Sequence, residues 1–186
     1  MKNFLGIVKE FLIIGFIVLV IVVPLRTLVF QPFLVRGSSM EPNYHNGDYL
    51  IVDELSYRLR EPERGEVIVF QFPGNPSQRY IKRIVGLPGE TIEIKDGKVV
   101  LYNEVGGRKA VVLDESPYLS SQTETTGSLK VTLKSNEYFV LGDNRLFSSD
   151  SRAWGVLPRD KIIGRVLIRV FPVSGLAYIQ APNYSY

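Results

Sequence analysis

The N-terminal part of the chain is a continuous apolar segment. Residues 11–25 contain no charged side chain, and residues 4–8 extend the apolar character toward the N-terminus. A helix over residues 4–25, rising about 1.5 Å per residue, would reach roughly 30 Å and cross a hydrocarbon core. The segment lacks the amphipathic period of a helix packed on a domain surface. We therefore predict a short tail at residues 1–10 and a transmembrane anchor at residues 11–30.

A cleaved secretory signal is the alternative interpretation, since a basic start before an apolar stretch is typical of one. Residues 24–30 contain no small-x-small pair at which such a signal would be cut, so we expect the segment to remain as an anchor. The flanking charges leave its orientation open, because Lys2 and Lys9 precede the span while Arg26 and Arg36 follow it.

Beyond the anchor the pattern changes to short apolar or alternating runs separated by turn residues, which is typical of β-strands. The runs are Val29–Val35, Tyr49–Val52, Glu66–Phe72, Arg79–Val85, Thr91–Ile94, Lys98–Tyr102, Tyr138–Leu141 and Ile162–Val170. Asp96-Gly97 has the composition of a two-residue hairpin turn between two of them. Leu55–Arg60 is the main candidate for a helix. We therefore predict a mainly β domain over residues 31–186.

Residues 104–135 differ from their flanks, because they are rich in Gly, Ser and Thr and contain few large apolar side chains. This composition is typical of an excursion on the surface rather than of a central core. We predict a small, partly mobile β subdomain inserted at about residues 95–136.

Composition excludes several kinds of site. The chain has no Cys and a single His, which rules out disulfides, thiolate metal sites and a Cys nucleophile and argues against a His-rich metal site. Without Lys2, Lys9 and Arg26 on one side and Glu10 on the other, residues 27–186 carry 19 Lys and Arg against 18 Asp and Glu. A nearly neutral domain has no field to hold phosphates, so we expect no nucleic-acid partner.

With Cys excluded, the densest segment that holds a nucleophile is Gly37–Pro42, which follows an apolar strand-like run. A serine at a strand end, beside Gly and before Pro, can present both its Oγ and a free N–H to a substrate carbonyl. An ordinary Ser-rich turn has the same composition, so this segment alone does not identify an enzyme.

Two residues are candidates for the base that such a serine needs. His45 is the single imidazole, but it lies in a polar turn. A lysine can replace histidine when burial lowers its pKa toward neutrality, since the uncharged amine then takes the serine proton. Strand alternation places Lys82 on one face with Tyr80 and Ile84, and an exposed face of an edge strand is the alternative for it.

A third dense segment, Gly142–Gly155, is rich in Asp, Asn, Arg and Ser. Its acidic and basic side chains are spaced so that ion pairs could fix a loop, and a hydroxyl could contact a buried amine. A calcium loop is the competing interpretation, but the EF-hand spacing and its closing Glu are absent.

Together these segments resemble the bacterial type I signal peptidases, membrane-tethered serine proteases that remove signal peptides from exported proteins. The resemblance follows the chain in order, from S-M-x-P at 39–42 through 47–57, 64–70 and 80–90 to 142–155. A single preceding span and a small insert are more similar to the compact form of Gram-positive bacteria than to the two-span form. The fold implied is one transmembrane helix followed by a β-sheet-rich, barrel-like catalytic domain with a small β insert.

The resemblance also implies roles for particular residues. Ser39 is the nucleophile, Lys82 is the general base, and Ser148 matches the hydroxyl that orients the lysine amine. The supporting ion pairs fall on Arg83, Asp143, Asp150 and Arg152. The Ser39 N–H forms part of the oxyanion hole, whereas Gly37 lacks the hydroxyl with which some relatives supply a second donor. No metal or cofactor is implied.

The partners implied are the signal peptides of secretory preproteins, cut after small-x-small sites, and the lipid bilayer. The extended end of a signal peptide would add between the strand that leads to Ser39 and the strand that carries Lys82. Residues that match or neighbour the family's shallow pockets are Phe33, Val35, Met40, Tyr80 and Ile81. The location implied is the plasma membrane, single-pass, with the catalytic domain on the extracytoplasmic side.

Two other functions are compatible with the residues. Repressor-type autoproteases share a Ser–Lys dyad, but they are soluble, and this chain has no helix-turn-helix region. A membrane-anchored β module without activity, whose partner is a bound protein, is the second.

Overall fold

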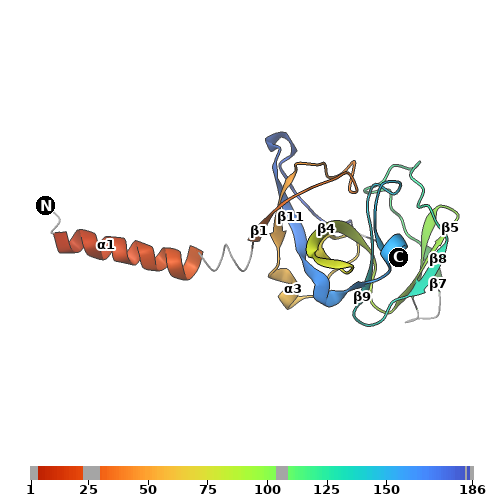
Figure 1. Ribbon diagram of the computed structural model, residues 1–186, viewed down its shortest axis with the longest axis horizontal. Coiled ribbons are helices and arrows are strands. Elements are labelled where there is room, and N and C mark those ends of the chain that lie inside the picture. The colour runs from red at the N-terminus through yellow and green to blue at the C-terminus, as the bar shows by residue number, and fades with distance from the viewer. Residues whose placement is uncertain (1–3, 23–29, 104–108, 183, 185–186) are drawn as a thin grey trace.

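The computed structural model describes residues 4–22, 30–103, 109–182 and 184. It begins with the helix α1 (Phe4–Ile17), which continues as one π-helical turn, η1 (Val18–Val22). Figure 1 shows α1 standing apart from the β body, and its large side chains are exposed, Phe11 by 71% and Leu12 by 69%.

The helix begins at Phe4, so residues 4–10 of the predicted tail are helical and continuous with the first part of the predicted anchor. Residues 1–3 of the predicted tail and 23–29 of the predicted anchor lie outside the described part of the chain. Within the described ranges, no helix is both long enough and apolar enough to cross a membrane.

The body contains a sheet of eight strands, ordered β1-β2-β11-β3-β4-β9-β10, with β12 paired to β11. Their bounds are β1 Phe30–Leu34, β2 Tyr49–Asp53, β3 Val67–Phe72, β4 Asn75–Gly86, β9 Glu137–Leu141, β10 Leu157–Pro158, β11 Ile162–Phe171 and β12 Ala177–Tyr178. Neighbouring strands are antiparallel. The short helices are α3 (Ser56–Leu59), α4 (Ser151–Trp154), and the 3-10 turns η2 (Arg159–Lys161) and η3 (Val173–Gly175). The predicted mainly β domain is confirmed.

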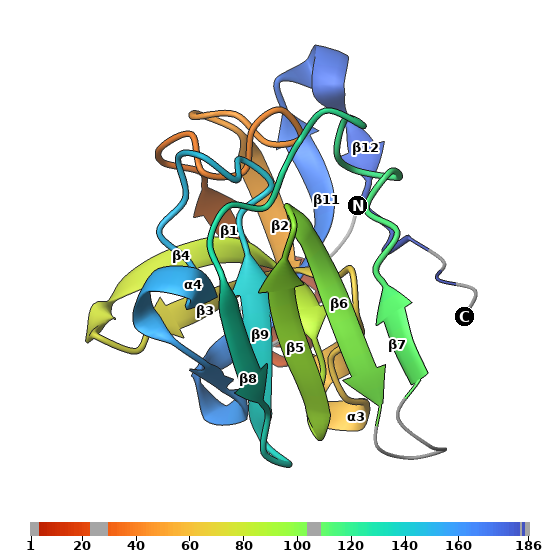
Figure 2. The same cartoon turned by 90° about the vertical axis from the view of Figure 1, so that its right-hand side faces the viewer.

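A second sheet of four strands, ordered β7-β6-β5-β8, covers one end of the body (Figure 2). Its strands are β5 (Glu90–Lys95), β6 (Lys98–Asn103), β7 (Lys109–Val112) and β8 (Leu129–Thr132). The predicted hairpin turn joins β5 to β6, with positive φ at both Asp96 (52°) and Gly97 (74°).

This second sheet extends from Glu90 to Thr132 and overlaps the region of the predicted insert at about residues 95–136. Ile92 and Ile94 of β5 pack in one cluster with Val85 of β4 and Phe139 and Leu141 of β9. The insert therefore shares a core with the main sheet rather than forming one of its own.

The alternation along β4 positions the candidate base. Ile81 packs in one apolar cluster with Val35 and Met40, whereas Ile84 and Tyr80 belong to another. Lys82 follows the second face, with its Nζ 5.5 Å from the centroid of the Tyr80 ring. The predicted alternation is confirmed.

Candidate active site

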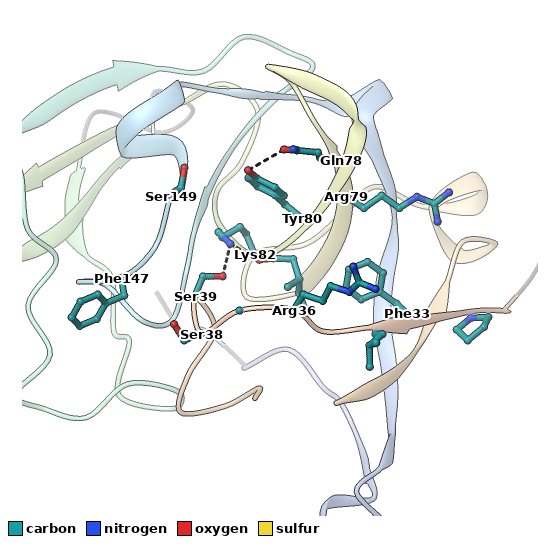
Figure 3. A pocket seen from close by; sticks show the side chains of 14 residues that line it. Phe33, Arg36, Ser38, Ser39, Gln78, Arg79, Tyr80, Lys82, Phe147 and Ser149 are labelled. Atoms are coloured by element: carbon teal, nitrogen blue, oxygen red, sulfur yellow. Dashed lines mark hydrogen bonds between the residues drawn. The ribbon is translucent and has the colours of Figure 1, made fainter. Parts of the chain in front are cut away.

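The structure brings Ser39 and Lys82 together from two separate elements. Ser39 lies in the turn after β1, and Lys82 lies in the middle of β4. Their Oγ and Nζ atoms are 2.7 Å apart (Figure 3). When the amine is neutral, this contact lets the Ser39 hydroxyl donate its proton to Nζ, which is the geometry that a general base requires.

Burial makes such a neutral amine accessible near physiological pH. Lys82 is 3% exposed, and its second hydrogen bond goes to the Ile81 carbonyl at 2.8 Å. Burial lowers the pKa of Lys82 from 10.5 to about 8, against the opposing charges of Asp150 and Asp143. The lysine is therefore buried rather than on an exposed face of an edge strand.

We predict that activity rises with pH on a limb governed by Lys82. Only the neutral amine accepts the Ser39 proton, so kcat/KM should fall about tenfold for each pH unit below the pKa of about 8. Initial rates with a preprotein between pH 5.5 and 9.5 measure this limb. A midpoint near pH 6.5 would instead indicate a histidine base.

The loop between β9 and α4 holds the backbone of Ser39. The Asn144 N–H donates to the Ser39 carbonyl at 3.1 Å, and the Asn144 side-chain amide donates to the Ser38 carbonyl at 3.1 Å. Neither bond involves the Ser39 hydroxyl, which stays free to react with a substrate. The sequence marked this loop as a candidate, but it did not indicate that Asn144 binds the turn.

Gly142 permits this close approach. A Cβ added there would lie 2.5 Å from the Ser39 carbonyl oxygen and 2.5 Å from Ser148 Cβ. Real Cβ atoms do not approach backbone oxygens so closely, so an alanine would displace the turn or the loop.

We therefore predict that Gly142→Ala lowers kcat/KM by about 100-fold, because displacing a reacting group by about 1 Å has an effect of this size. Gly15→Ala in α1 is the matched control, since a Cβ there meets nothing within 4 Å and its activity should stay at the wild-type level. Equal activity of the two variants would contradict the proposed role of Gly142.

Two ion pairs brace the loop, as the sequence indicated. Arg83 donates to both carboxylate oxygens of Asp143, at 2.8 and 2.6 Å, and Arg152 binds Asp150 in the same way, at 2.8 Å for each bond. Burial alone would raise the pKa of Asp150, but its bonds from Arg152 and from the Gly142 N–H hold that pKa below the usual range.

A third brace was not predicted. Arg145, with a side chain 0% exposed, binds both oxygens of Glu115 and the hydroxyl of Thr125. Its Nε also donates to the Gly142 carbonyl at 3.0 Å. The segment between β7 and β8 therefore supports the loop between β9 and α4 directly. The sequence offered little sign of it, because Glu115 lies in a polar stretch without periodicity.

Neither Ser148 nor His45 makes a side-chain hydrogen bond to Ser39 or Lys82 among the described residues. The Ser148 hydroxyl is buried and close enough to Asp150 to help lower the pKa of that carboxyl, but it makes no hydrogen bond of good geometry within the described residues. Its orienting role toward Lys82 stays a prediction. His45 is exposed in its turn, and the partner of the Ser39 hydroxyl is Lys82 rather than His45.

A groove of about 690 Å³ opens beside the dyad (Figure 3). Its lining includes Phe33, Tyr80 and Ile81, three of the predicted substrate contacts. Val35 and Met40, also predicted contacts, pack in the core at 2% and 1% exposure. Val35 lies on the same face as Phe33 but deeper in that core, and neither residue lines the groove. The contact of these two residues with a substrate stays a prediction.

Two strands beside this groove have edges whose backbone groups are not paired with a neighbouring strand. Among the described strands, β1 pairs with β2 alone, and β4 pairs with β9 only from Arg83 to Gly86. The edge over residues 78–82 is therefore open on that side. The Arg79 guanidinium lies 3.4 Å from the Gln31 side-chain oxygen, so the two edges face each other near one end of the groove.

The second donor of an oxyanion hole does not come from Gly37. Its N–H is already bound to the Asn46 side-chain oxygen at 3.0 Å, and its φ of +88° fixes a left-handed turn that favours glycine. Among the described residues, no group of three or more potential ligands could hold a metal ion. The calcium interpretation is disfavoured, because Arg83 and Arg152 occupy the two loop carboxylates.

The amino-acid sequence of this chain is similar to those of known proteins. The family model described as "Signal peptidase, peptidase S26" matches residues 8–171. The chain is 39% identical to a probable signal peptidase I-2 of Synechocystis, over 83% of this chain and 69% of that protein. It is 36% identical to a signal peptidase I of Leptolyngbya laminosa, over 88% and 79%, and 36% identical to signal peptidase I T of Bacillus subtilis, over 81% and 78%.

Among solved structures, the chain is similar to a signal peptidase I from Enterococcus faecalis, with 31% identity and a TM-score of 0.46. The match covers 57% of this chain and 97% of that one.

Proposed function

The chain belongs to the signal peptidase I family of serine peptidases, and on this premise we propose that it removes signal peptides from exported preproteins with Ser39 as nucleophile and Lys82 as general base. The observation that supports the dyad most strongly is the 2.7 Å contact between Ser39 Oγ and a buried lysine amine. The relatives it matches are named as signal peptidases, which favours this function over an autoprotease or an inactive binding module.

The chemistry divides into acylation and deacylation, and in each half Lys82 accepts a proton and then donates it. The neutral amine takes the proton of Ser39 Oγ as that oxygen attacks the scissile carbonyl, and the Ser39 N–H stabilises the developing oxyanion. The protonated amine then donates to the departing amino group, which leaves an acyl-enzyme. Water, activated by the same amine, hydrolyses the ester and restores Ser39. The Ser148 hydroxyl is the candidate for orienting the amine between these steps.

The groove supports an extended substrate. The open edges of β1 and β4 offer backbone hydrogen bonds on both sides of a peptide strand, and Phe33, Tyr80 and Ile81 supply its apolar lining. We propose that the residues before the scissile bond bind here and that the site selects small-x-small sequences, such as Ala-x-Ala.

We further propose that residues 11–30 form a single membrane span and place the β domain on the extracytoplasmic side of the plasma membrane. The exposed apolar side chains of α1 support this anchor. Contact between so large an apolar surface and water is unfavourable, whereas contact with lipid is not. The protein should stay in the membrane pellet after alkaline carbonate extraction. Release into the supernatant would contradict a spanning anchor.

We expect the full chain in a non-ionic detergent to cleave a preprotein after its Ala-x-Ala site. The cleavage position is read by mass spectrometry of the mature product. A matched preprotein with leucine at the residue before the scissile bond is the control, and its cleavage should fall at least tenfold, because a shallow pocket has no room for it. Cutting at unrelated positions, or equal cutting of both preproteins, would contradict the proposed specificity.

A further inference from the structure

A second groove of about 530 Å³ adjoins the catalytic turn. Its lining includes Glu41 and Pro42 from the turn after β1, and Gln122 and Glu124 from the segment before β8. It also includes Asn144 and Leu146 from the loop between β9 and α4, which we call the catalytic loop. We call it the leaving-side groove. Neither Ser39 nor Lys82 lines it, and no step of the proposed mechanism involves it.

The two grooves lie end to end along the same two segments. The turn after β1 gives Ser38 and Ser39 to the first groove and Glu41 and Pro42 to the leaving-side groove. The catalytic loop likewise gives Phe147 to the first groove and its preceding residues to the second. In Figure 3, Phe147 and Ser38 stand at the end of the first groove opposite Arg79 and Phe33.

Ser39 therefore lies at the junction. Asn144 walls the leaving-side groove and also donates to the Ser39 carbonyl at 3.1 Å, so this groove begins at the backbone of the nucleophile. A peptide that fills the first groove up to a scissile carbonyl at Ser39 continues past this point. We propose that the leaving-side groove binds the first residues of the mature segment, on the C-terminal side of the scissile bond.

The charges of this groove identify the sequences it prefers. Asp143 and Arg145 in its wall are buried and paired with Arg83 and Glu115, so they add no net charge. Glu41 and Glu124 make no ion pair within the described part of the chain. Leu146, exposed by 72%, adds an apolar surface to the lining. The groove therefore favours a mature segment with cationic side chains near its start.

Three peptides test this inference, which rests on the proposed function. They share an Ala-x-Ala site and the first residue after it, and carry Lys, Gln or Glu at the next two positions. With wild-type protein in a non-ionic detergent at low salt, kcat/KM for the Lys peptide should exceed that for the Glu peptide about fivefold, an effect of the size expected for exposed charge pairs. The difference should shrink in 0.5 M salt.

The double variant Glu41→Gln, Glu124→Gln should bring the Lys-to-Glu ratio close to one. Glu63→Gln is the matched control, because it removes an exposed carboxylate outside both grooves, and it should keep the wild-type ratio. A wild-type ratio near one, or a ratio that persists in the double variant, would overturn the inference while leaving the proposed function intact. Absence of cleavage for all three peptides would instead contradict the proposed function itself.

Discussion

The substitution Lys82→Met should abolish cleavage without unfolding the protein. Methionine has a similar length, fits the apolar surroundings of a side chain that is 3% exposed, and cannot accept the Ser39 proton. Loss of a member of a nucleophile–base pair lowers the rate by about 10⁴-fold or more. Initial rates with a preprotein measure this loss at equal concentrations of folded protein.

The same variant should be at least as stable as the wild type at pH 7. The pKa of Lys82 falls from 10.5 to about 8 on burial, so at pH 7 the amine is protonated in both states and its burial opposes folding by about 3 kcal/mol. Between pH 8 and pH 10.5 the unfolded chain binds the extra proton, and the wild-type free energy of unfolding should rise through this window. The methionine variant should lack this rise.

Denaturant unfolding of the full chain, followed by fluorescence of Trp154, measures both effects, since Trp154 is the single tryptophan and packs on Phe70 and Phe72. Lys134→Met is the matched control, because Lys134 is 81% exposed; it should keep both activity and stability. Substantial activity in folded Lys82→Met would show that another group is the base.

Asp143→Ala should have the largest effect on stability. The Asp143 side chain is 0% exposed, and its partner Arg83 is 5% exposed, so the substitution leaves a buried cation without its counter-charge. Breaking a buried pair in this way destabilises a protein by about 3–5 kcal/mol. Asn43, which donates to the same carboxylate at 2.8 Å, loses its acceptor too.

Denaturant unfolding measures the free energy of unfolding of Asp143→Ala, and Asp160→Ala is the control variant. Asp160 is 74% exposed and lies 3.9 Å from Lys161, and such a surface pair contributes at most about 1 kcal/mol. Replacing both partners, Arg83→Met with Asp143→Leu, should recover part of the loss, since no buried charge then remains. A loss below about 1 kcal/mol for Asp143→Ala would show that Arg83 finds another partner or reaches water.

The main β architecture could be predicted from the sequence, because strands and hairpin turns depend on local patterns, whereas the pairing of Ser39 with Lys82, 43 residues away, was implied by the family resemblance. Alternation along residues 79–85 already placed Lys82 on the face of Tyr80, and the Asp96-Gly97 turn defined its hairpin. The short strands β7 and β8 were missed, since they lie in a polar segment whose apolar positions are few. They form only by pairing with β6 and β5.

Contacts between distant segments could not be predicted from periodicity. Glu115 and Arg145 are 30 residues apart, and nothing in either local pattern indicates that their side chains meet in the core. The burial of two predicted substrate contacts has a similar cause. Val35 and Met40 flank the catalytic turn, but which side chains of the turn face the groove depends on how it packs against β2 and β11.

The most direct test of the Ser–Lys mechanism is the rate of preprotein cleavage by wild type and by Ser39→Ala, each shown to be folded by its Trp154 fluorescence. We predict cleavage at the Ala-x-Ala site by the wild type and a rate at least about 10⁴-fold lower for the variant. Cleavage of the same site by folded Ser39→Ala at a rate near that of the wild type would contradict the assignment of Ser39 as the nucleophile.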